Sequence, residues 1–531
     1  MMEFDYLVVG GGSAGCVLAA RLSEDPAVTV ALLEAGPTDS SMLLHCPAGI
    51  ALLARTGGAN WCFETVPQPG LNGRRGYQPR GKVLGGSSSI NAMVYIRGHR
   101  ADYDGWAAAG NPGWSYDEVL PYFIRAENNE RGADRFHGSG GPLNVMDLAS
   151  PNRHTADFLA AAAQAGHRLN PDFNGEEQQG VGGYQVTHRG GERFSAAKAY
   201  LTPNLGRPNL RVITSAHATR VLFEGRRAIG VEYLQDGDHK QVRARREVLL
   251  SAGALLSPQL LMLSGIGPGK QLQQLGIATL LDQSGVGANL HDHPDVIQVI
   301  DSPALTELFG ISPRGVWNLL AGIREWSRGR SGCLTTNFAE AGGFLKSRPE
   351  EPLPDVQLHF VVGKLMDHGR KTVFGHGYSC HVCLLRPKSR GSLKLASADP
   401  LAAPLIDPNF LAEDEDVAGM VRGFKLMRHI LQQPALAELG GRELAVSAAA
   451  QTDAEIAEFI RNRADSIYHP VGSCRMGPAA SDVVDAELRV KGISGLRVVD
   501  ASVMPQIVGG NTNAPTMMIA EKAADMIRSA E

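Results

Sequence analysis

The sequence predicts an α/β fold in which a parallel sheet is interrupted by an inserted α+β domain that contains an antiparallel sheet. Three observations support this prediction. A glycine-rich turn joins the first apolar run to a helical pattern, and similar apolar runs return in the middle and near the end of the chain. Between them lie alternating segments that are typical of half-buried antiparallel strands.

The N-terminal segment has the pattern of a nucleotide-binding turn. An apolar run at 6–9 indicates a buried strand, and Gly10, Gly12 and Gly15 follow it before a helical pattern begins. Gly10 allows a tight turn, Gly12 lets the backbone approach a pyrophosphate, and Gly15 lets helix and strand pack closely. The free N–H groups at the start of the helix would then face the phosphates.

A second apolar run, 28–33, ends at Glu34, which lies 19 residues after Gly15. A carboxylate at this distance can accept hydrogen bonds from a ribose. An ordinary strand–turn–helix corner has no need of that acid. We therefore predict a Rossmann-like domain that binds an ADP-containing dinucleotide.

The later elements follow from the same patterns in chain order. The pattern predicts strands of the first sheet over 210–214, 228–233, 247–251 and 496–500, and a C-terminal helix over 514–529. Antiparallel strands are expected over 354–360 and 378–387. Further helices are expected over 313–326, 414–431 and 453–464, the last opening on the capping box Thr452-Asp453-Ala454-Glu455.

The chain of 531 residues is too long for one core and predicts two large domains. We assign 1–150, 206–300 and 475–531 to the nucleotide-binding domain. The segments 151–205 and 301–474 are assigned to a substrate domain that covers the cofactor and shapes a pocket.

Composition excludes several functional classes. Hydrophobic content is 43%, charged content is 20% and net charge is −4, so nothing favours a nucleic-acid partner. The seven cysteines are an odd number without regular spacing, which favours reduced thiols. No signal peptide or transmembrane segment is predicted. We expect a cytoplasmic protein, at most peripheral to the inner membrane.

Two further glycine clusters, 80–91 and 251–268, would bring backbone close to a flat ligand. A flexible linker is the alternative for the first, but apolar residues such as Ile90 within it disfavour that interpretation. In the second, a strand ends in a glycine turn, a helix is expected to start near Pro258, and Gly265 breaks it.

At 81–98 and 253–268, together with the N-terminal pattern, the chain resembles the glucose–methanol–choline (GMC) family of flavin-dependent oxidoreductases over nearly its whole length. The resemblance implies an FAD-binding domain rather than an NAD-binding one. Some relatives carry a histidine that links covalently to the flavin where this chain has Ile90, so non-covalent FAD is expected. The FAD contacts that the resemblance implies are Gly10, Gly12, Ser13, Ala14, Gly15, Glu34, Ala35, Gly85, Gly86, Ser87, Asn91, Ala92, Val221, Ala252, Gly253, Tyr468, Asp500, Ala501, Asn511 and Thr512.

The resemblance also implies the catalytic pair. Its active-site base is the histidine of the segment 468–473, here His469, and a His or Asn some forty-odd residues later completes the pair. Asn513 lies 44 residues after His469, so Asn513 rather than Asn511 is assigned to this role. Neutral His469 would take the hydroxyl proton of an alcohol while hydride passes to flavin N5, and Asn513 would orient the oxygen.

The expected activity is oxidation of a primary alcohol to its aldehyde by an enzyme like the bacterial choline dehydrogenases. Choline itself would need a carboxylate and an aromatic cage in the pocket. A quinone or another carrier is the favoured electron acceptor. Open alternatives are an oxidase that uses O₂, like hydroxymethylfurfural or choline oxidases, a flavin lyase of the same family, and a non-enzymatic flavin-binding sensor. Oligomeric state is not predicted.

Three weaker patterns are interpreted structurally. Cys380 and Cys383 would point to opposite faces of a strand, so buried strand cysteines are favoured over a redox or metal pair. The run His291-Asp292-His293 matches a family loop near the cofactor, and no metal is assigned. The apolar side chains of the helix 313–326 are expected to lie in the core or in the pocket wall.

Overall fold

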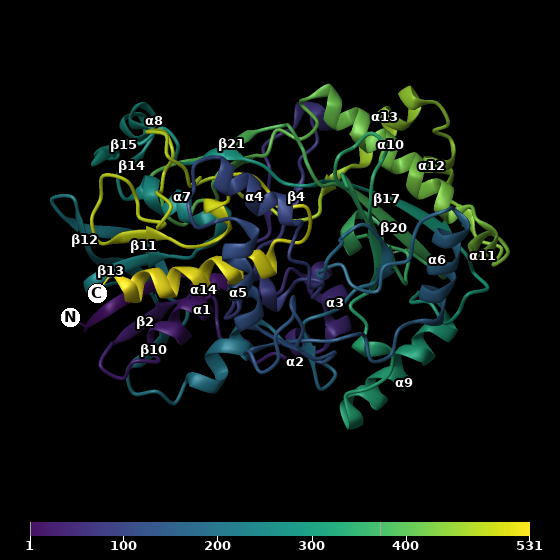
Figure 1. The fold of residues 1–531 in the computed structure, drawn as a ribbon, viewed down its shortest axis with the longest axis horizontal. Coiled ribbons are helices and arrows are strands. Elements are labelled where there is room, and N and C mark those ends of the chain that lie inside the picture. Colours follow the sequence, from purple (N-terminus) through teal and green to yellow (C-terminus); the bar gives the residue numbers. More distant parts are fainter. Residues whose placement is uncertain (1, 372, 531) are drawn as a thin grey trace.

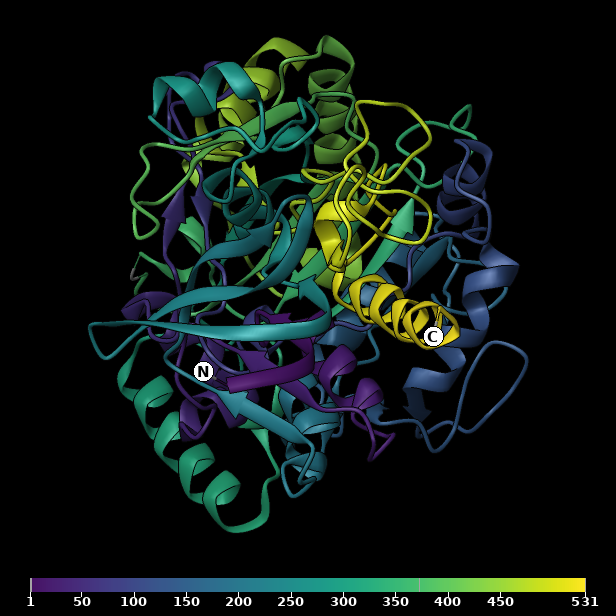
Figure 2. The same cartoon turned by 90° about the vertical axis from the view of Figure 1, so that its left-hand side faces the viewer.

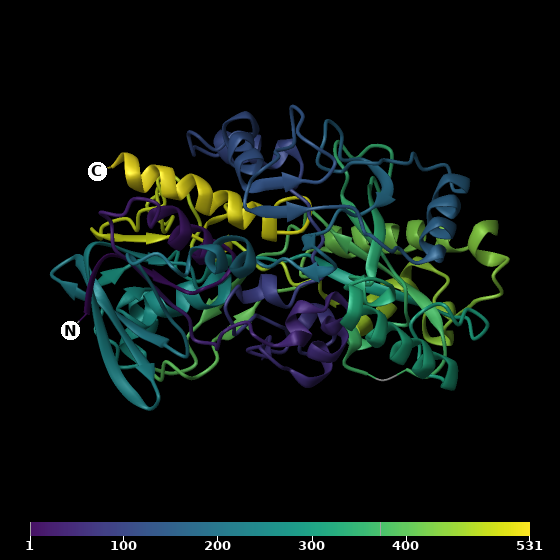
Figure 3. The same ribbon diagram turned by 90° about the horizontal axis from the view of Figure 1, so that it is seen from below.

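The computed structural model describes residues 2–371 and 373–530. The chain folds around two sheets of seven strands, each with its own hydrophobic cluster. Figure 3 shows the two sheets at opposite ends of the molecule, with the short helices of residues 42–56 between them. A mixed α/β fold with an antiparallel sheet in the inserted part is therefore confirmed.

The first sheet has the order β10-β2-β1-β13-β12-β11, and β25 pairs with β13. Its strands β10, β2, β1, β13 and β25 are parallel, and β2 together with the last residues of β1 and β13 is apolar and buried. The hairpin of β11 and β12 extends it antiparallel. The strands are β1 (Met2–Val9), β2 (Val30–Leu33), β10 (Leu210–Ile213), β11 (His217–Glu224), β12 (Arg227–Gln235), β13 (Asp238–Leu250) and β25 (Leu496–Val498).

Helices α1 (Ser13–Leu22), α5 (Tyr116–Ala126) and α14 (Asn513–Ser529) pack together beside this sheet (Figures 1 and 2). The carboxylate of Glu521 lies at their centre and is fully buried. It accepts hydrogen bonds from Arg21 at 2.9–3.1 Å, from Arg125 at 2.9 Å and from the Tyr200 hydroxyl at 2.8 Å. The first and last helices of the chain are thereby joined through one carboxylate.

The second sheet has the order β23-β17-β20-β19-β18-β7, with β24 paired to β17, and is antiparallel throughout. Helix α10 (Asp414–Leu431) packs on it, flanked by α6 (Arg153–Gln164) and α13 (Asp453–Arg463). Its strands are β7 (Gly180–Gly183), β17 (Pro294–Asp301), β18 (Ala339–Leu345), β19 (Val356–Val361), β20 (Gly377–Leu384), β23 (Arg442–Glu443) and β24 (Asp465–Ser466).

The remaining elements connect the two sheets and cover their edges (Figure 1). The helices among them are α2 (Met42–His45), α3 (Ile50–Thr56), α4 (Arg100–Ala108), α7 (Gly253–Leu263), α8 (Gly269–Gln274), α9 (Pro313–Gly329), α11 (Pro434–Ala437) and α12 (Ala445–Ala448). The strands are β3 (Phe63–Glu64), β4 (Tyr77–Gln78), β5 (Glu127–Asn129), β6 (Leu143–Val145), β8 (His188–Arg189), β9 (Glu192–Arg193), β14 (Ile266–Gly267), β15 (Leu281–Asp282), β16 (Ala288–Leu290), β21 (Gly391–Lys394) and β22 (Leu405–Asp407).

Two details differ from the sequence prediction. Strand β17 begins at Pro294, inside the range expected for the nucleotide-binding domain, yet it pairs in the second sheet. Helix α7 begins at Gly253, five residues before Pro258, so the proline lies inside the helix. The carbonyl of Ala254, which has no N–H partner at Pro258, accepts a hydrogen bond from the Ser473 hydroxyl instead.

Removing the charge of Glu521 tests the junction of α1, α5 and α14. Glu521→Gln removes the buried charge that the partly exposed Arg21 and Arg125 share, so we expect it to lower the free energy of unfolding by about 2 kcal/mol. Glu24→Gln, which removes a partly exposed partner of Arg21, should cost less than about 1 kcal/mol. Urea unfolding followed by circular dichroism measures both variants. Equal losses would contradict the assignment.

Candidate active site

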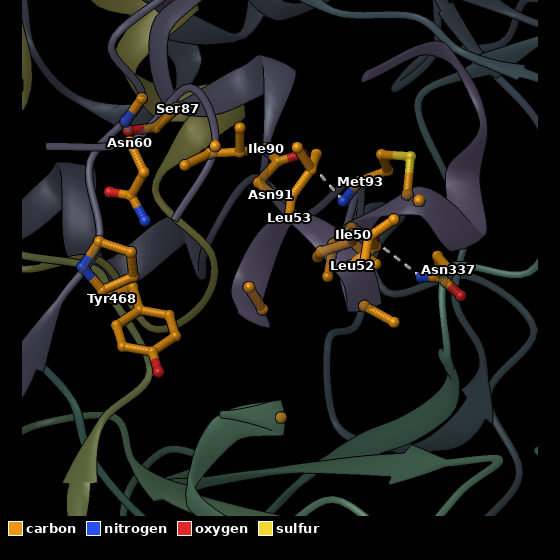
Figure 4. Close-up of a pocket in the computed structure, with 18 of the residues that line it drawn as sticks. Ile50, Leu52, Leu53, Asn60, Ser87, Ile90, Asn91, Met93, Asn337 and Tyr468 are labelled. Atoms are coloured by element: carbon orange, nitrogen blue, oxygen red, sulfur yellow. Dashed lines mark hydrogen bonds between the residues drawn. The ribbon is translucent and has the colours of Figure 1, made fainter. Parts of the chain in front are cut away.

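A cavity of about 1280 Å³ runs between the two sheets. The glycine turn after β1 lines one end, and residues of the second sheet line the other. Figure 4 shows Ile50, Leu52 and Leu53 of α3 grouped beside Ile90 and Asn91 of the glycine cluster 80–91.

The glycines at the first end are required by their surroundings. Gly10 has a φ of +102°, and a Cβ there would lie 2.5 Å from the carbonyl oxygen of Ser251. A Cβ on Gly15 would collide with the carbonyl of Gly10. A Cβ on Gly86 would lie 2.7 Å from Cα of Gly12, so the two glycine turns meet backbone to backbone. Only residues without side chains allow this approach, which leaves exposed backbone beside the cavity.

Glu34 follows β2 and lines the same end of the cavity. Its two carboxylate oxygens accept hydrogen bonds from the N–H groups of Gly11 at 2.8 Å and Gly36 at 2.7 Å. Burial raises the pKa of this carboxyl to about 7. A buried acid held at the end of β2, beside a glycine cradle and a helix N-terminus, suits a ribose and a pyrophosphate. The residues present therefore fit the dinucleotide that the sequence predicts.

Most of the predicted FAD-binding residues surround the cavity. Gly15, Gly85 and Val221 do not line it: Gly15 packs against Gly10, and the N–H of Val221 donates to the Ser264 hydroxyl at 2.9 Å. The cofactor roles of all these residues stay predictions. The predicted residues that line the cavity are Gly10, Gly12, Ser13, Ala14, Glu34, Ala35, Gly86, Ser87, Asn91, Ala92, Ala252, Gly253, Tyr468, Asp500, Ala501, Asn511 and Thr512. Ala216, His217 and Ala218 line it as well, although no sequence motif marks them.

The backbone around His469 is held in an unusual conformation. Tyr468 has a φ of +73°, which is a strained value for a bulky side chain. Its carbonyl accepts a hydrogen bond from Arg80 at 2.7 Å, and its N–H donates to the Ser466 hydroxyl at 2.6 Å. One carboxylate oxygen of Asp292 accepts the N–H of His469 at 2.8 Å. These contacts fix the direction in which the His469 side chain leaves the backbone.

Both ring nitrogens of His469 have partners. Nδ1 lies 3.1 Å from Nδ1 of His293, and Nε2 lies 3.2 Å from the amide nitrogen of Asn511. The other nitrogen of His293, Nε2, lies 3.1 Å from the carbonyl oxygen of Leu385. A carbonyl only accepts, so neutral His293 carries its proton on Nε2 and accepts at Nδ1. His469 must then donate from Nδ1, which leaves a lone pair on Nε2.

The surroundings of His469 keep it neutral. Burial lowers the pKa of His469 well below its usual value, and His293, His359 and Arg80 lower it further. Burial likewise lowers the pKa of His293 to about 3. A neutral imidazole that is unprotonated on Nε2 is a proton acceptor. His469 also lines the cavity, so a bound hydroxyl that replaces the Asn511 amide at Nε2 would reach the lone pair of this nitrogen.

The structure places Asn511, and not Asn513, against His469. The side-chain oxygen of Asn513 accepts the Ser13 hydroxyl at 2.7 Å. Asn513 is the first residue of α14, which packs against α1, and its side chain therefore turns towards the start of α1. Asn511 precedes this helix. A spacing of 44 residues does not determine whether an asparagine side chain points towards His469 or towards the start of α1.

His293 is a second residue of the site that the sequence pattern does not single out. The run 291–293 divides its tasks: Nε2 of His291 accepts the N–H of Ile507 at 2.9 Å, Asp292 binds the backbone of His469, and His293 binds its ring. Its one signal in the sequence is that the run matches a family loop near the cofactor. Cys380 and Cys383 are buried free thiols on β20, as expected for strand cysteines.

Helix α9 corrects another expectation. The buried side of this helix consists of Gly322 and Trp326, whereas Trp317 is 66% exposed and Leu320 is 57% exposed. The interpretation as core or pocket wall is therefore wrong for Trp317 and Leu320, and it is confirmed for Leu319, Ile323 and Trp326, which line the cavity. Within residues 2–371 and 373–530, no helix combines the length and apolar character needed to cross a membrane.

The chain is similar in sequence and in fold to known oxidoreductases. The chain is 50% identical over 530 residues to the alcohol dehydrogenase [acceptor] of Pseudomonas putida, covering 99% of this chain and 95% of the relative. It is 46% identical to the mitochondrial choline dehydrogenase of Mus musculus, covering 99% and 89%. The solved structure of pyridoxine 4-oxidase from Mesorbium loti superposes with a TM-score of 0.88 at 32% identity, covering 98% of each chain.

The family model described as GMC oxidoreductase matches in two parts, an N-terminal part over residues 4–295 and a C-terminal part over residues 387–520. The first part contains the glycine cradle and Glu34. The second contains His469 and Asn511. The chain therefore belongs to the GMC oxidoreductase family and, like its alcohol and choline dehydrogenase relatives, is an FAD-dependent oxidoreductase that acts on CH–OH donors.

Proposed function

We propose that this chain oxidises an uncharged primary alcohol to its aldehyde, with His469 as the base and non-covalent FAD as the cofactor. The observation that carries the proposal is the neutral, buried His469 whose Nε2 lone pair lies beside the Asn511 amide at the cavity. FAD, when bound, supplies the hydride acceptor at flavin N5. Ile90 lines the cavity and offers no nitrogen for a covalent link to flavin.

The side chains divide the proton chemistry between them. A substrate hydroxyl donates to Nε2 of His469 and then transfers its proton there. The amide nitrogen of Asn511 carries hydrogens that can be donated to the substrate oxygen and orient it. Asn511 thus takes the role that the spacing assigned to Asn513. His293 accepts the hydrogen bond from Nδ1 of His469 and keeps the imidazole in position throughout.

The acids of the cavity favour an uncharged substrate. Glu34 is bound to the backbone of the nucleotide turn, and Asp500 accepts hydrogen bonds from Ser257 and Gly253. Among the described residues that line the cavity, the only other carboxylates are Glu307 and Glu325, both exposed. A quaternary ammonium group such as that of choline would therefore lack a buried counter-charge. The similarity to an alcohol dehydrogenase supports the same substrate class.

We propose a quinone or another carrier as the electron acceptor, and a location at the surface of a membrane. Helix α9 supports this location because its apolar side chains Trp317 and Leu320 are exposed and do not line the cavity, unlike Val316, Leu319 and Ile323 of the same helix. Exposed arginines of the same helix, Arg314, Arg324 and Arg328, would face anionic lipid head groups.

Anaerobic mixing with alcohols tests the reaction. We expect medium-length primary alcohols to bleach the flavin absorbance of the purified protein and choline to bleach it far more slowly. His469→Ala should keep bound FAD. Its rate of flavin reduction by the alcohol should fall by about 100-fold or more, because the base is lost. Slow recovery of colour in air would indicate a carrier as acceptor, and fast recovery an oxidase. Bleaching by no alcohol would contradict the proposal and favour a lyase.

The pH dependence tests the role of neutral His469. Because the unprotonated form is active and its pKa is lowered, kcat/KM should stay constant as pH falls through about 6.5, the usual value. It should fall only in a more acidic range, by about tenfold per pH unit. The slower reaction of His469→Ala should lack this acid limb. A limb centred at or above the usual histidine value would contradict the assignment.

Vesicle flotation tests the role of α9. The double variant Trp317→Ser/Leu320→Ser should bind anionic phosphatidylglycerol vesicles more weakly than the unmodified chain, since two apolar side chains leave the interface. The control Leu169→Ser/Leu401→Ser removes two exposed leucines from other surfaces. Equal binding by both double variants, or no binding by the unmodified chain, would contradict membrane association through α9.

A further inference from the structure

We propose that Gln357 is a positioning residue that holds the amide of Asn511 in the one orientation that leaves Nε2 of His469 unprotonated. This inference rests on the proposed role of His469 as base. Gln357 is a side chain of β19 in the inserted sheet. None of its observed hydrogen bonds is to the ring of His469 or His293.

Gln357 is fully buried and stands at the start of a continuous chain of hydrogen bonds. Its amide nitrogen donates to the side-chain oxygen of Asn511 at 3.0 Å and lies 3.2 Å from the Tyr184 hydroxyl. That hydroxyl donates to the carbonyl of Leu358 at 2.6 Å, so its oxygen accepts from Gln357. The backbone carbonyl therefore determines which end of the Gln357 amide faces Asn511.

The direction of the Asn511 amide follows from that of Gln357. With its oxygen occupied by Gln357, Asn511 presents its nitrogen to Nε2 of His469. At the other end of this series of hydrogen bonds, the carbonyl of Leu385 orients His293, which accepts from Nδ1 of His469. Two backbone carbonyls, one from each end, thus define the direction of every hydrogen bond between them.

The reversed amide would disable the base. If Asn511 turned its oxygen towards His469, Nε2 would need a proton to make the bond, and Nδ1 would then oppose the lone pair of His293. The alternative is a protonated, cationic His469, which burial disfavours. A donor at position 357 therefore stabilises the reactive form of His469. Because Gln357 belongs to the inserted sheet, this sheet takes part in setting the protonation of the base.

The first test replaces Gln357 by a residue whose side chain has no hydrogen-bond donor. Gln357→Leu should slow anaerobic flavin reduction by a primary alcohol by about tenfold, the loss expected for one oriented hydrogen bond. The matched control is Gln298→Leu, because Gln298 is also a buried glutamine of the same sheet, on β17, and makes none of the observed bonds to His469 or Asn511. The control should retain the unmodified rate. FAD content and thermal midpoint of both variants show whether the fold persists.

The pH profile separates positioning from packing. Gln357→Glu replaces the donor with an acceptor, which favours the reversed amide and a protonated Nε2, so the acid limb of kcat/KM should move to higher pH. The other titratable groups that face His469 stay unchanged: Asp292 and His293 before β17, His359 on β19, and Arg80 after β4. An acid limb at the same pH in Gln357→Glu would overturn the inference.

A double-mutant cycle tests whether Gln357 acts through Asn511. In the Asn511→Ala background, Gln357→Leu should cause no further slowing, because the amide that it orients is absent. A tenfold loss in both backgrounds, or no loss in either, would overturn the inference. These outcomes differ from failure of the proposed function, in which His469→Ala would itself reduce flavin at the normal rate.

Discussion

The arrangement of the site depends on one requirement: a buried imidazole that stays neutral and unprotonated on Nε2. His469 meets it through contacts from distant parts of the chain. Asp292 holds its backbone, His293 accepts from its Nδ1, and Asn511 lies against its Nε2. The inserted sheet reaches the same ring through Gln357. The two sheets must therefore be placed correctly relative to each other before these contacts to His469 can form.

This requirement has an energetic cost that the rest of the fold offsets. Tyr468 is held at a φ unfavourable for its side chain. Burial also keeps His293 in its uncharged form. Two large hydrophobic clusters, one for each sheet, supply the stabilisation. The strained Tyr468 and the neutral His469 both line the cavity.

The division of the cavity explains how one family can act on different substrates. The end near β1 is built from backbone, with glycines that tolerate no side chain and Glu34 held by N–H groups. Such a surface suits one cofactor and leaves little room for variation. The other end is lined by side chains of α3, α9 and the second sheet, which can change without disturbing the glycine cradle. In this chain they provide apolar surface and no buried carboxylate for a cation.

Local sequence alone determined the parts that depend on near neighbours. The β1–turn–α1–β2 unit and Glu34 follow from apolar periodicity and from the stereochemistry of glycine, and α10 occupies the 18 residues that its pattern predicts. His469 and FAD followed from a resemblance carried by motifs in the chain. The family of the chain is confirmed, and the role of each residue stays a prediction.

Only the tertiary structure decided which side chains meet. His293 lies 176 residues from His469 in the chain, and Gln357 lies 154 residues from Asn511. Asn511 and Asn513 are the same residue type two positions apart, and the start of α14 sends them to different partners. The exposed apolar side of α9 has the same periodicity as a buried one. Periodicity reports that a face is apolar, but what covers that face depends on contacts between segments remote in sequence.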